Sequence, residues 1–494
     1  MSTSGNVALP SSTLLQGLPV VSGDPFLPLA AENALERIRD LYWQRGYNDV
    51  RSDYELAVDR AAGRVDVVFS VVEGSQSIVG EVVVAGNVKT TDHLVREQVE
   101  LETAQPIDVS KLAQSRRNLY ETGAFSVVDI TREELPQNGH SGQQPVRLNV
   151  SVREVQPIQL RYGASYDTER GPGGTVDLSN HNTLGKARVI GLRARYDGEI
   201  RDARAYYSQP SLRYVPVQLT GTVYFFEDRN PSTTTTRSFT VARKGASIEG
   251  ETTLRDRYVW GYGYRFERAR TLNREPTGIL DETYTVAPLT LTLTRETRDE
   301  VLDATRGAFL SHAFEYSPSW LGAEREYVRY LGQYFHYFAL QRERRKRFTN
   351  ETIRPRFVFA TGARLGLARG FADPLPTSER FFAGGSTTLR GSEQNAIGPI
   401  GPGRIPLGGA AMLVLNNEVR FPLVSIVDGV VFSDIGNVYP RLSDFSLSDM
   451  RESAGAGLRV RTPWFLIRGD YGVLLDRRNG EPRGRFYFSI GQAF

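Results

Sequence analysis

The sequence predicts a transmembrane antiparallel β-barrel of about sixteen strands, preceded by small α+β domains. Three observations support this prediction. The chain holds 47 Gly, 23 Tyr and 24 Phe but 3 Met, a balance that favours strands and tight turns over helical packing. From about residue 156 onward, long segments alternate apolar and polar residues with a period of two. The polar face of these segments carries ionised side chains in the middle of the expected strands.

Composition excludes several classes of function. The 494 residues carry a net charge of +3, which does not fit a nucleic-acid binder with a clustered basic surface. The absence of Cys excludes a disulfide framework, a thiolate zinc site, an iron–sulfur cluster and a cysteine nucleophile. No apolar run is long enough for a transmembrane helix. Residues 1–10 have neither a basic n-region nor an apolar h-region, so an exported chain would have lost its signal peptide before this point.

The first part of the chain reads as two copies of one α+β unit of about 75 residues, at 1–76 and 77–155. LAAENALERIRDLYWQRGY (29–47) has helical spacing and ends at Gly46, and the similar SKLAQSRRNLYETGAF opens a second helix at Ser110. The first copy shows no convincing opening strand, so it is truncated or degenerate. The other expected elements are strands at 54–58, 65–72, 78–84, 126–130 and 146–152 and a helix at 92–102.

The segment 156–494 is expected to form the barrel, with a spacing of about 21 residues per strand and turn. Burying its ionised positions inside a soluble β-sandwich would cost several kcal/mol per unpaired charge, whereas a hydrated lumen accepts them. One or two soluble sandwiches remain the alternative. These ionised positions are Arg193, Arg195, Arg459, Arg461, Arg468 and Asp470. The aromatic residues expected in the interface girdles are Tyr162, Tyr166, Tyr262, Tyr264, Tyr327, Tyr330 and Phe335.

Two stretches carry more specific information. ERFFAGGSTTLRGSEQNAIGP (379–399) lies in a connection of about 40 residues, at 368–411, and loops of that length are usually functional. Its glycines allow a compact backbone, and Arg390 is the long cation near its tip. The chain ends with GRFYFSIGQAF (484–494), a strand with aromatic residues on one face and at its last position.

These stretches resemble the signature loop and closing strand of outer-membrane assembly factors of the BamA and TamA type, in the bacterial surface antigen family. The resemblance covers the chain from about residue 20 onward and implies two POTRA repeats, a sixteen-stranded barrel and a loop folded into the lumen. Ser392 departs from the family pattern, which has Phe or Tyr at that place. The motif residues are Arg380, Phe381, Phe382, Gly384, Gly385, Leu389, Arg390 and Gly391.

In this family the loop arginine pairs with acids on nearby strands. Glu418 lies on the lumen-facing side of the expected strand 412–421, and Asp434 lies in FSDIGNVYP at the place of a family motif. We therefore expect a lumenal cluster of Arg390, Glu418 and Asp434, in which removal of one partner costs about 3–5 kcal/mol. Without the motif, Arg390 would be read as a solvated loop cation.

The function implied by the resemblance is a non-enzymatic assembly factor that folds and inserts client β-barrel or autotransporter proteins. The first and last strands would meet in a weak seam that opens to a client strand by edge pairing. Expected partners are unfolded clients, periplasmic chaperones or an inner-membrane-anchored partner at the POTRA repeats, lipid and lipopolysaccharide, with no cofactor and no nucleic acid. The residues expected at the seam are Tyr162, Gly163, Gly484, Phe486, Phe488, Gly491 and Phe494.

The alternative is a two-partner secretion pore of the same superfamily, which passes an unfolded polypeptide through the lumen. The RFFAGG loop and the lack of an amphipathic plug helix before residue 29 favour assembly. A passive porin needs no periplasmic repeats. Residues 171–174 read as a loop without phosphate-binding chemistry, and 341–347 as a basic solvated turn or a headgroup contact. The histidines, which show no metal-ligand spacing, are His93, His140, His181, His312 and His336.

Overall fold

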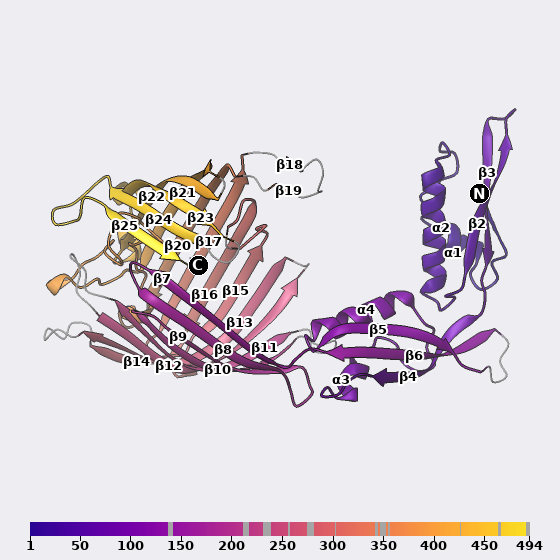
Figure 1. The fold of residues 1–494 in the computed structure, drawn as a ribbon, viewed down its shortest axis with the longest axis horizontal. Coiled ribbons are helices and arrows are strands. Elements are labelled where there is room, and N and C mark those ends of the chain that lie inside the picture. The colour runs from indigo at the N-terminus through magenta and orange to yellow at the C-terminus, as the bar shows by residue number, and fades with distance from the viewer. Residues whose placement is uncertain are drawn as a thin grey trace. The chain divides into compact units, whose positions relative to one another are not determined.

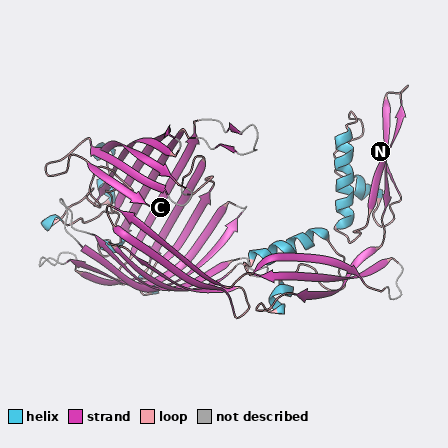
Figure 2. Ribbon diagram, viewed as in Figure 1, coloured by secondary structure: helices cyan, strands magenta, loops and turns pink. Residues whose placement is uncertain are grey.

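The computed structural model describes residues 1–136, 142–210, 217–230, 239–254, 257–273, 281–301, 303–340, 344–345, 352–353, 356–424, 426–462 and 466–490. The chain divides into two compact units. The first comprises residues 1–157 with 181–188 and 210–216, and the second comprises 158–180, 189–209 and 217–494. Figure 1 labels their helices and strands, and Figure 2 shows that the long helices lie in the first unit.

The first α+β repeat is a three-stranded sheet in the order β1-β3-β2, with helices α1 and α2 packed on it. Helix α2 begins with proline in its first turn, and its buried face carries Ala34, Ile38 and Tyr42 at helical spacing. Gly46, with a φ of +86°, turns the chain after the helix. The element bounds are β1 (Ser2–Ser4), α1 (Ser11–Leu15), α2 (Pro28–Trp43), β2 (Arg51–Asp59) and β3 (Arg64–Val72).

One expectation for this repeat is wrong. The first copy does have an opening strand, because β1 pairs in parallel with β3. This strand is three polar residues long and has no apolar alternation, so its pattern carries no signal. Helix α1 lies before residue 29 and buries Leu14 in the core of the repeat.

The second repeat has the same sheet order, β4-β6-β5, with helices α3 and α4. Thr91 caps α3 and Asp108 caps α4 by accepting hydrogen bonds from Leu94 N and Ser110 N. The expected helix from 92 to 102 is shorter in the structure and ends at Glu97. The bounds are β4 (Gln76–Ala85), α3 (Asp92–Glu97), α4 (Val109–Glu121), β5 (Phe125–Glu134) and β6 (Gln143–Glu154).

In each repeat, a glutamate at the end of the last strand binds backbone N–H groups of the segment that follows the first strand. Glu73, just after β3, accepts hydrogen bonds from the backbone N–H groups of Val7 and Ala8, at 2.8 Å each. Glu154, at the end of β6, accepts from those of Lys89 and Thr90 at 2.9 and 2.6 Å. Each carboxylate therefore ties the last strand of its repeat to the chain that follows the first strand.

The barrel closes through β7 to β17 and β20 to β25 in antiparallel order, as Figure 1 shows from its labels. Strands β14 and β15 both pair with β13 and form one strand interrupted at Ala287 and Pro288, so the barrel has sixteen strands. The bounds are β7 (Ile158–Asp167), β8 (Gly171–Thr183), β9 (Arg188–Tyr196), β10 (Ile200–Gln209), β11 (Gln218–Asn230), β12 (Phe239–Leu254), β13 (Tyr258–Asn273), β14 (Glu282–Val286), β15 (Leu289–Glu296), β16 (Gly307–Ser317), β17 (Tyr327–Ala339), β20 (Val358–Gly370), β21 (Ala411–Val424), β22 (Val427–Tyr439), β23 (Arg451–Arg461), β24 (Leu466–Leu474) and β25 (Arg485–Ile490).

Short elements complete the described fold. A two-stranded sheet joins β18 (Arg344–Arg345) to β19 (Thr352–Ile353). The 3₁₀ helices are η1 (Ser319–Leu321), η2 (Thr377–Glu379), η3 (Pro402–Arg404), η4 (Leu442–Asp444) and η5 (Leu447–Asp449). No helix in the described part of the chain is long and apolar enough to cross a membrane.

The two faces of the barrel wall differ in chemistry. Large apolar side chains such as Leu192, Val223 and Ile248 are exposed on one face. Charged side chains pair on the other: Arg193 Nε lies 2.7 Å from Asp177 Oδ2. Two aromatic residues expected in the interface girdles face inward instead. Tyr327 is fully buried, and Phe335 lies under the Arg364 guanidinium at 4.8 Å.

Candidate functional site

The candidate site is the long connection between β20 and β21, which we call the inward loop (residues 371–410). It is three residues shorter at its start and one shorter at its end than the expected 368–411. Leu389 is fully buried, and Phe381 and Ile397 are nearly so, in a cluster that includes residues of the barrel wall. Gly384 has a φ of +117°, and a Cβ there would meet Glu393 O at 2.3 Å, so this turn accepts glycine alone.

The base of the inward loop is held by Glu379. Its carboxylate is buried and lies 3.6 Å from the Arg265 guanidinium of β13. Next to it, Arg243 of β12 donates a hydrogen bond to Ser378 O at 2.6 Å, and Ser378 N donates to Tyr284 Oη at 3.0 Å. Burial alone would raise the pKa of Glu379, but the charges of Arg265 and Arg243 outweigh it and hold the pKa below its usual range.

The RFF part of the motif closes the loop on itself. Arg380 donates hydrogen bonds to Leu375 O and Leu407 O, at 2.9 and 3.1 Å. Phe381 exchanges two backbone hydrogen bonds with Gly409, so the outgoing and returning parts of the loop are paired. The ring of Phe382 packs against Phe239, with 5.6 Å between the centroids. These residues shape the loop, and Phe382 also packs it against β12 of the wall.

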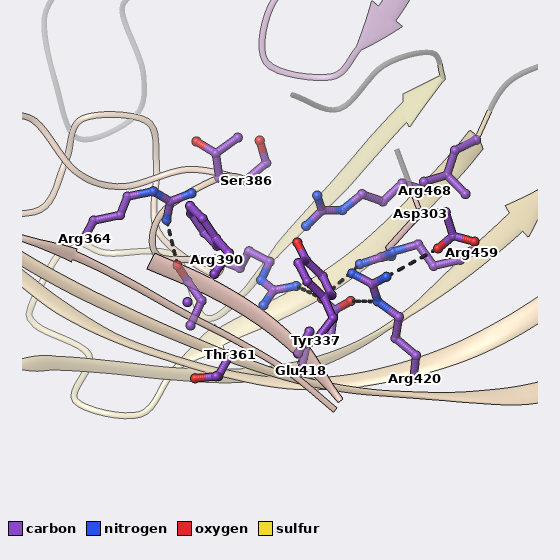
Figure 3. Close-up of a pocket in the computed structure, with 16 residues that line it drawn as sticks. Asp303, Tyr337, Thr361, Arg364, Ser386, Arg390, Glu418, Arg420, Arg459 and Arg468 are labelled. Atoms are coloured by element: carbon purple, nitrogen blue, oxygen red, sulfur yellow. Dashed lines mark hydrogen bonds and ion pairs between the residues drawn. The ribbon is translucent and has the colours of Figure 1, made fainter. Parts of the chain in front are cut away.

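At the tip, Arg390 meets both of its expected partners. Its Nε and Nη2 donate to Asp434 Oδ2 and Oδ1 at 2.8 Å each, and its Nη1 donates to Glu418 Oε2 at 2.9 Å. The guanidinium carbon lies 3.4 Å from the ring centroid of Phe432. Figure 3 shows Arg390 and Glu418 in the hollow lined by this network. Burial would lower the pKa of Arg390, but hydrogen bonding to Asp434 and nearby negative charge raise it above its ordinary value.

The network is larger than the sequence suggested. Asp470 Oδ2 lies 3.7 Å from Arg390 Nη1 and accepts a hydrogen bond from Arg468 Nε at 2.8 Å. Arg459 bridges Asp470 and Glu418, at 2.6 and 3.3 Å. The sequence identified three of these positions as lumenal charges, but only strand register joins them to the loop. Nothing in the sequence identified Glu379 as a residue of this site, apart from its position one residue before the motif.

Ser392, the departure from the family pattern, is buried at the tip. Its hydroxyl donates to Leu389 O at 2.6 Å, and its carbonyl accepts from Tyr487 Oη at 2.5 Å. Tyr487 Oη also accepts from Gly391 N at 3.0 Å. A phenol from the last strand thus satisfies backbone groups of the loop tip.

The seam joins β25 to β7, the last strand to the first. Among the described residues, Ser489 pairs with Asp167 and Ile490 with Tyr166. Thr168 N donates to Phe488 O at 3.0 Å, and the rings of Tyr166 and Phe488 lie 6.3 Å apart. Six residue pairs join β24 to β25 and ten join β7 to β8.

The residues expected at the seam fall into three groups. Phe486 and Phe488 lie on β25, with Gly484 directly before it. Tyr162 and Gly163 lie on β7 opposite Val176 and Thr175 of β8, and neither faces a described residue of β25. Gly491 and Phe494 lie outside the described residues. Positions 162 and 489 cannot be joined by a disulfide, because Ser489 faces Asp167 and the five strand residues from 162 to 167 span about 17 Å.

Other candidates from the sequence carry no site. Residues 171–174 are not a loop, because they open β8. Most of the basic segment 341–347 lies outside the described residues. The described part of the chain has no cluster of three or more His, Cys, Asp or Glu that could hold a metal ion.

Comparison with known proteins identifies both parts of the chain. Residues 182–494 match the model of the Omp85 superfamily domain, and residues 1–74 and 77–155 each match the POTRA model, the surface antigen variable number repeat. The outer membrane protein assembly factor BamA of Nitratidesulfovibrio vulgaris is 26% identical over 479 residues, covering 92% of this chain and 56% of that protein. BamA of Neisseria meningitidis is 23% identical over 485 residues, covering 87% and 58%. The chain thus spans a little over half the length of these relatives.

Solved structures agree at the level of the fold. BamA from Haemophilus ducreyi lacking POTRA domains 1–3 superposes with a TM-score of 0.75 at 19% identity, covering 97% of this chain and 96% of that one. CdiB from Escherichia coli gives a TM-score of 0.55 at 14% identity, covering 99% and 89%. CdiB from Acinetobacter baumannii gives 0.52 at 12%, covering 99% and 88%. The chain therefore belongs to the Omp85 superfamily, as an outer-membrane β-barrel protein with periplasmic POTRA domains.

Proposed function

We propose that this protein is an assembly factor that folds and inserts client β-barrel or autotransporter proteins into the outer membrane through the seam between β7 and β25. The observation that carries the proposal is the direct meeting of the first and last strands, where Ser489 pairs with Asp167 and Ile490 with Tyr166 among the described residues. Opening this contact exposes strand edges at membrane depth. A client strand can then pair with the exposed edge.

The proposal assigns no chemical step to any side chain. In lipid, the backbone groups of an unfolded client strand have no hydrogen-bond partners. The protein lowers the barrier to client folding by presenting the backbone donors and acceptors of its own strand edges. The POTRA sheets offer further edges, at β2 in the first repeat and β5 in the second. Unfolded clients, periplasmic chaperones or an inner-membrane-anchored partner would bind there, while lipid and lipopolysaccharide contact the barrel. The assembly factors among the sequence relatives support this reading.

Locking the seam tests the proposal. The natural chain has no cysteine, so Tyr166→Cys with Ile490→Cys introduces a single disulfide between two paired positions. In proteoliposomes, the oxidised variant is expected to stop client insertion and the reduced variant to restore it. Tyr162→Cys with Ser489→Cys is the matched control, because these positions are too far apart to bond. Full insertion with an oxidised seam would disprove the lateral route.

A two-partner secretion pore is the second candidate function. The likeness in fold to the CdiB structures favours it. A polypeptide passing through the lumen would have to displace the inward loop, which is tied to the wall at Glu379 and Arg390. The same seam disulfide separates the two functions, because it leaves a lumenal path open and closes a lateral one.

A further inference from the structure

Two turns on the first-strand side of the seam present acids to the inward loop. Glu169 lies in the turn between β7 and β8, and its Oε2 accepts hydrogen bonds from Ser386 N at 3.1 Å and Ser386 Oγ at 2.5 Å. Glu199 lies in the turn between β9 and β10, and its Oε2 accepts from Gln394 Nε2 at 2.9 Å. Two turns on the first-strand side of the barrel therefore accept hydrogen bonds from the loop tip.

The turns are built to hold these acids in position. Asp167 Oδ1 accepts hydrogen bonds from the backbone N–H groups of Glu169 and Arg170, at 2.9 and 2.6 Å. Asp197 Oδ1 does the same for Glu199 and Ile200, at 3.0 and 2.7 Å. Each aspartate fixes its turn through an Asx-type contact, which sets the direction of the glutamate that follows.

The loop also fits the acids. Gly385 has a φ of +93°, and a Cβ there would lie 2.7 Å from Glu169 Oε1, so a larger residue would push the carboxylate away. Glu169 Oε1 and Glu199 Oε1 are buried without a hydrogen-bond partner among the described residues. Glu199 is also paired with Arg170, whose Nε lies 3.4 Å from Glu199 Oε2. Burying a carboxylate oxygen without a partner is unfavourable, so contact with the loop contributes to holding these side chains in place.

The same loop tip is held by the last strand on the other side of the seam. Tyr487 of β25 contacts the backbone of Gly391 and Ser392, and Arg485 Nη1 lies 3.3 Å from the buried Glu393 carboxylate. Loop residues 386–394 therefore contact the turns after β7 and β9 and the last strand, β25. These side-chain contacts cross a seam whose described backbone pairing is two residues long.

We propose that Glu169 and Glu199 are positioning residues that hold the inward loop as a clasp across the seam, so that the seam opens only when these two acids release the loop. The consequence for client insertion rests on the proposed function above, whereas the clasp is a property of the barrel itself. On release, the two carboxylates would turn from the loop to water, which compensates in part for the lost contacts.

The rate of disulfide formation at the seam measures the clasp directly. In the Tyr166→Cys, Ile490→Cys background, Glu169→Gln with Glu199→Gln is expected to slow bond formation about fivefold, since weaker charge-assisted hydrogen bonds let the seam open more often. Glu324→Gln is the matched control: this exposed acid accepts from Thr285 N in a turn away from the seam, and its loss should leave the rate unchanged. Heat-dependent migration in detergent gels checks that each barrel is folded.

A second pair of variants approaches the clasp from the loop. Ser386→Ala with Gln394→Ala removes the two side-chain donors and leaves both acids and the backbone N–H of residue 386 in place. This variant tests the clasp even if the acid variants fail to fold. It should slow the disulfide to a similar extent. Parental rates in both folded double variants would overturn the clasp. Client insertion is measured in parallel: a slower disulfide with unchanged insertion would leave the clasp standing and contradict the proposed function instead.

Discussion

Arg390 and Asp434 form a two-bond ion pair in which Nε and Nη2 of the arginine donate to the two carboxylate oxygens at 2.8 Å each. The backbone N–H of Arg390 donates to the same carboxylate at 3.1 Å, so one acid fixes both the side chain and the turn of the loop. Guanidinium is the group that matches this geometry, because its donors lie in one plane with the spacing of a carboxylate. The pair therefore orients the tip as well as binding it.

This pair predicts a graded loss of barrel stability. Arg390→Ala leaves Asp434 buried without its partner and is expected to cost about 3–5 kcal/mol. Arg390→Lys keeps the charge but loses the two-bond geometry, so its loss should be intermediate. The midpoint temperature of gel migration in detergent measures both. Arg478→Lys, at an exposed ion pair with Asp449, should leave the midpoint unchanged. An unshifted midpoint in Arg390→Ala would contradict the role of this pair.

The sequence was informative where one residue pattern decides the local structure. The two-residue alternation predicted the barrel, and the helical spacing of 29–47 predicted α2. It failed at β1, whose three polar residues are a strand only because β3 lies beside them. It also placed Tyr327 and Phe335 in a girdle, although in β17 they share the inward-facing side with Arg329, which pairs with Glu315. Which of two alternating faces meets lipid depends on neighbouring strands.

The candidate site was also predicted in part. The motif and the charge pattern led to Arg390, Glu418 and Asp434, which the structure brings together. The register of β25 against β7 could not be read from the sequence, because turn lengths accumulate over sixteen strands. Glu169 and Glu199 were missed because an acid in a turn normally faces water.

The base of the inward loop gives a second prediction. Glu379→Gln removes the charge that faces Arg265 and Arg243, so the base should detach from the wall more often. Trypsin cleavage after Arg380 and Arg390 in the folded protein reports this exposure, and it should become faster than in the parent. Glu296→Gln, which alters a partly exposed pair with Arg298, is the control. Equal cleavage rates in both variants would rule out an anchoring role for Glu379.

The phenol of Tyr487 gives a third prediction. Tyr487→Phe leaves Gly391 N and Ser392 O buried without their partner, which costs about 1–3 kcal/mol. The ring is kept, so packing of the last strand is unchanged and the loss is confined to the loop tip. Hydrogen exchange of loop peptides covering 386–394 should increase, while peptides from β16 and β17 should not change. Unchanged exchange at the tip would show that water replaces the phenol without loss.

The second POTRA repeat gives a prediction about pH. Burial alone would raise the pKa of Glu154, but hydrogen bonds from Thr90 and Lys89 outweigh it, so the folded pKa lies below the ordinary value. The contribution of Glu154 to stability is therefore present above the unfolded pKa, about 4.3, and is lost as pH falls through the lower folded pKa. The urea midpoint of residues 77–155, followed by hydrogen exchange of their peptides in the full chain, should fall as the pH drops below the unfolded pKa, about 4.3.

Glu154→Gln separates this carboxylate from the others that titrate in the same range. The amide still accepts the hydrogen bonds of Lys89 and Thr90, but it carries no charge at any pH. The variant should be less stable than the parent near neutral pH, because charge-assisted bonds are the stronger ones, and the two midpoints should converge in acid. Glu73 occupies the equivalent place in the first repeat, so Glu73→Gln should lower the midpoint of residues 1–74 while leaving that of 77–155 unchanged. A constant gap between parent and Glu154→Gln across the whole range would mean that the charge of Glu154 does not stabilise the repeat.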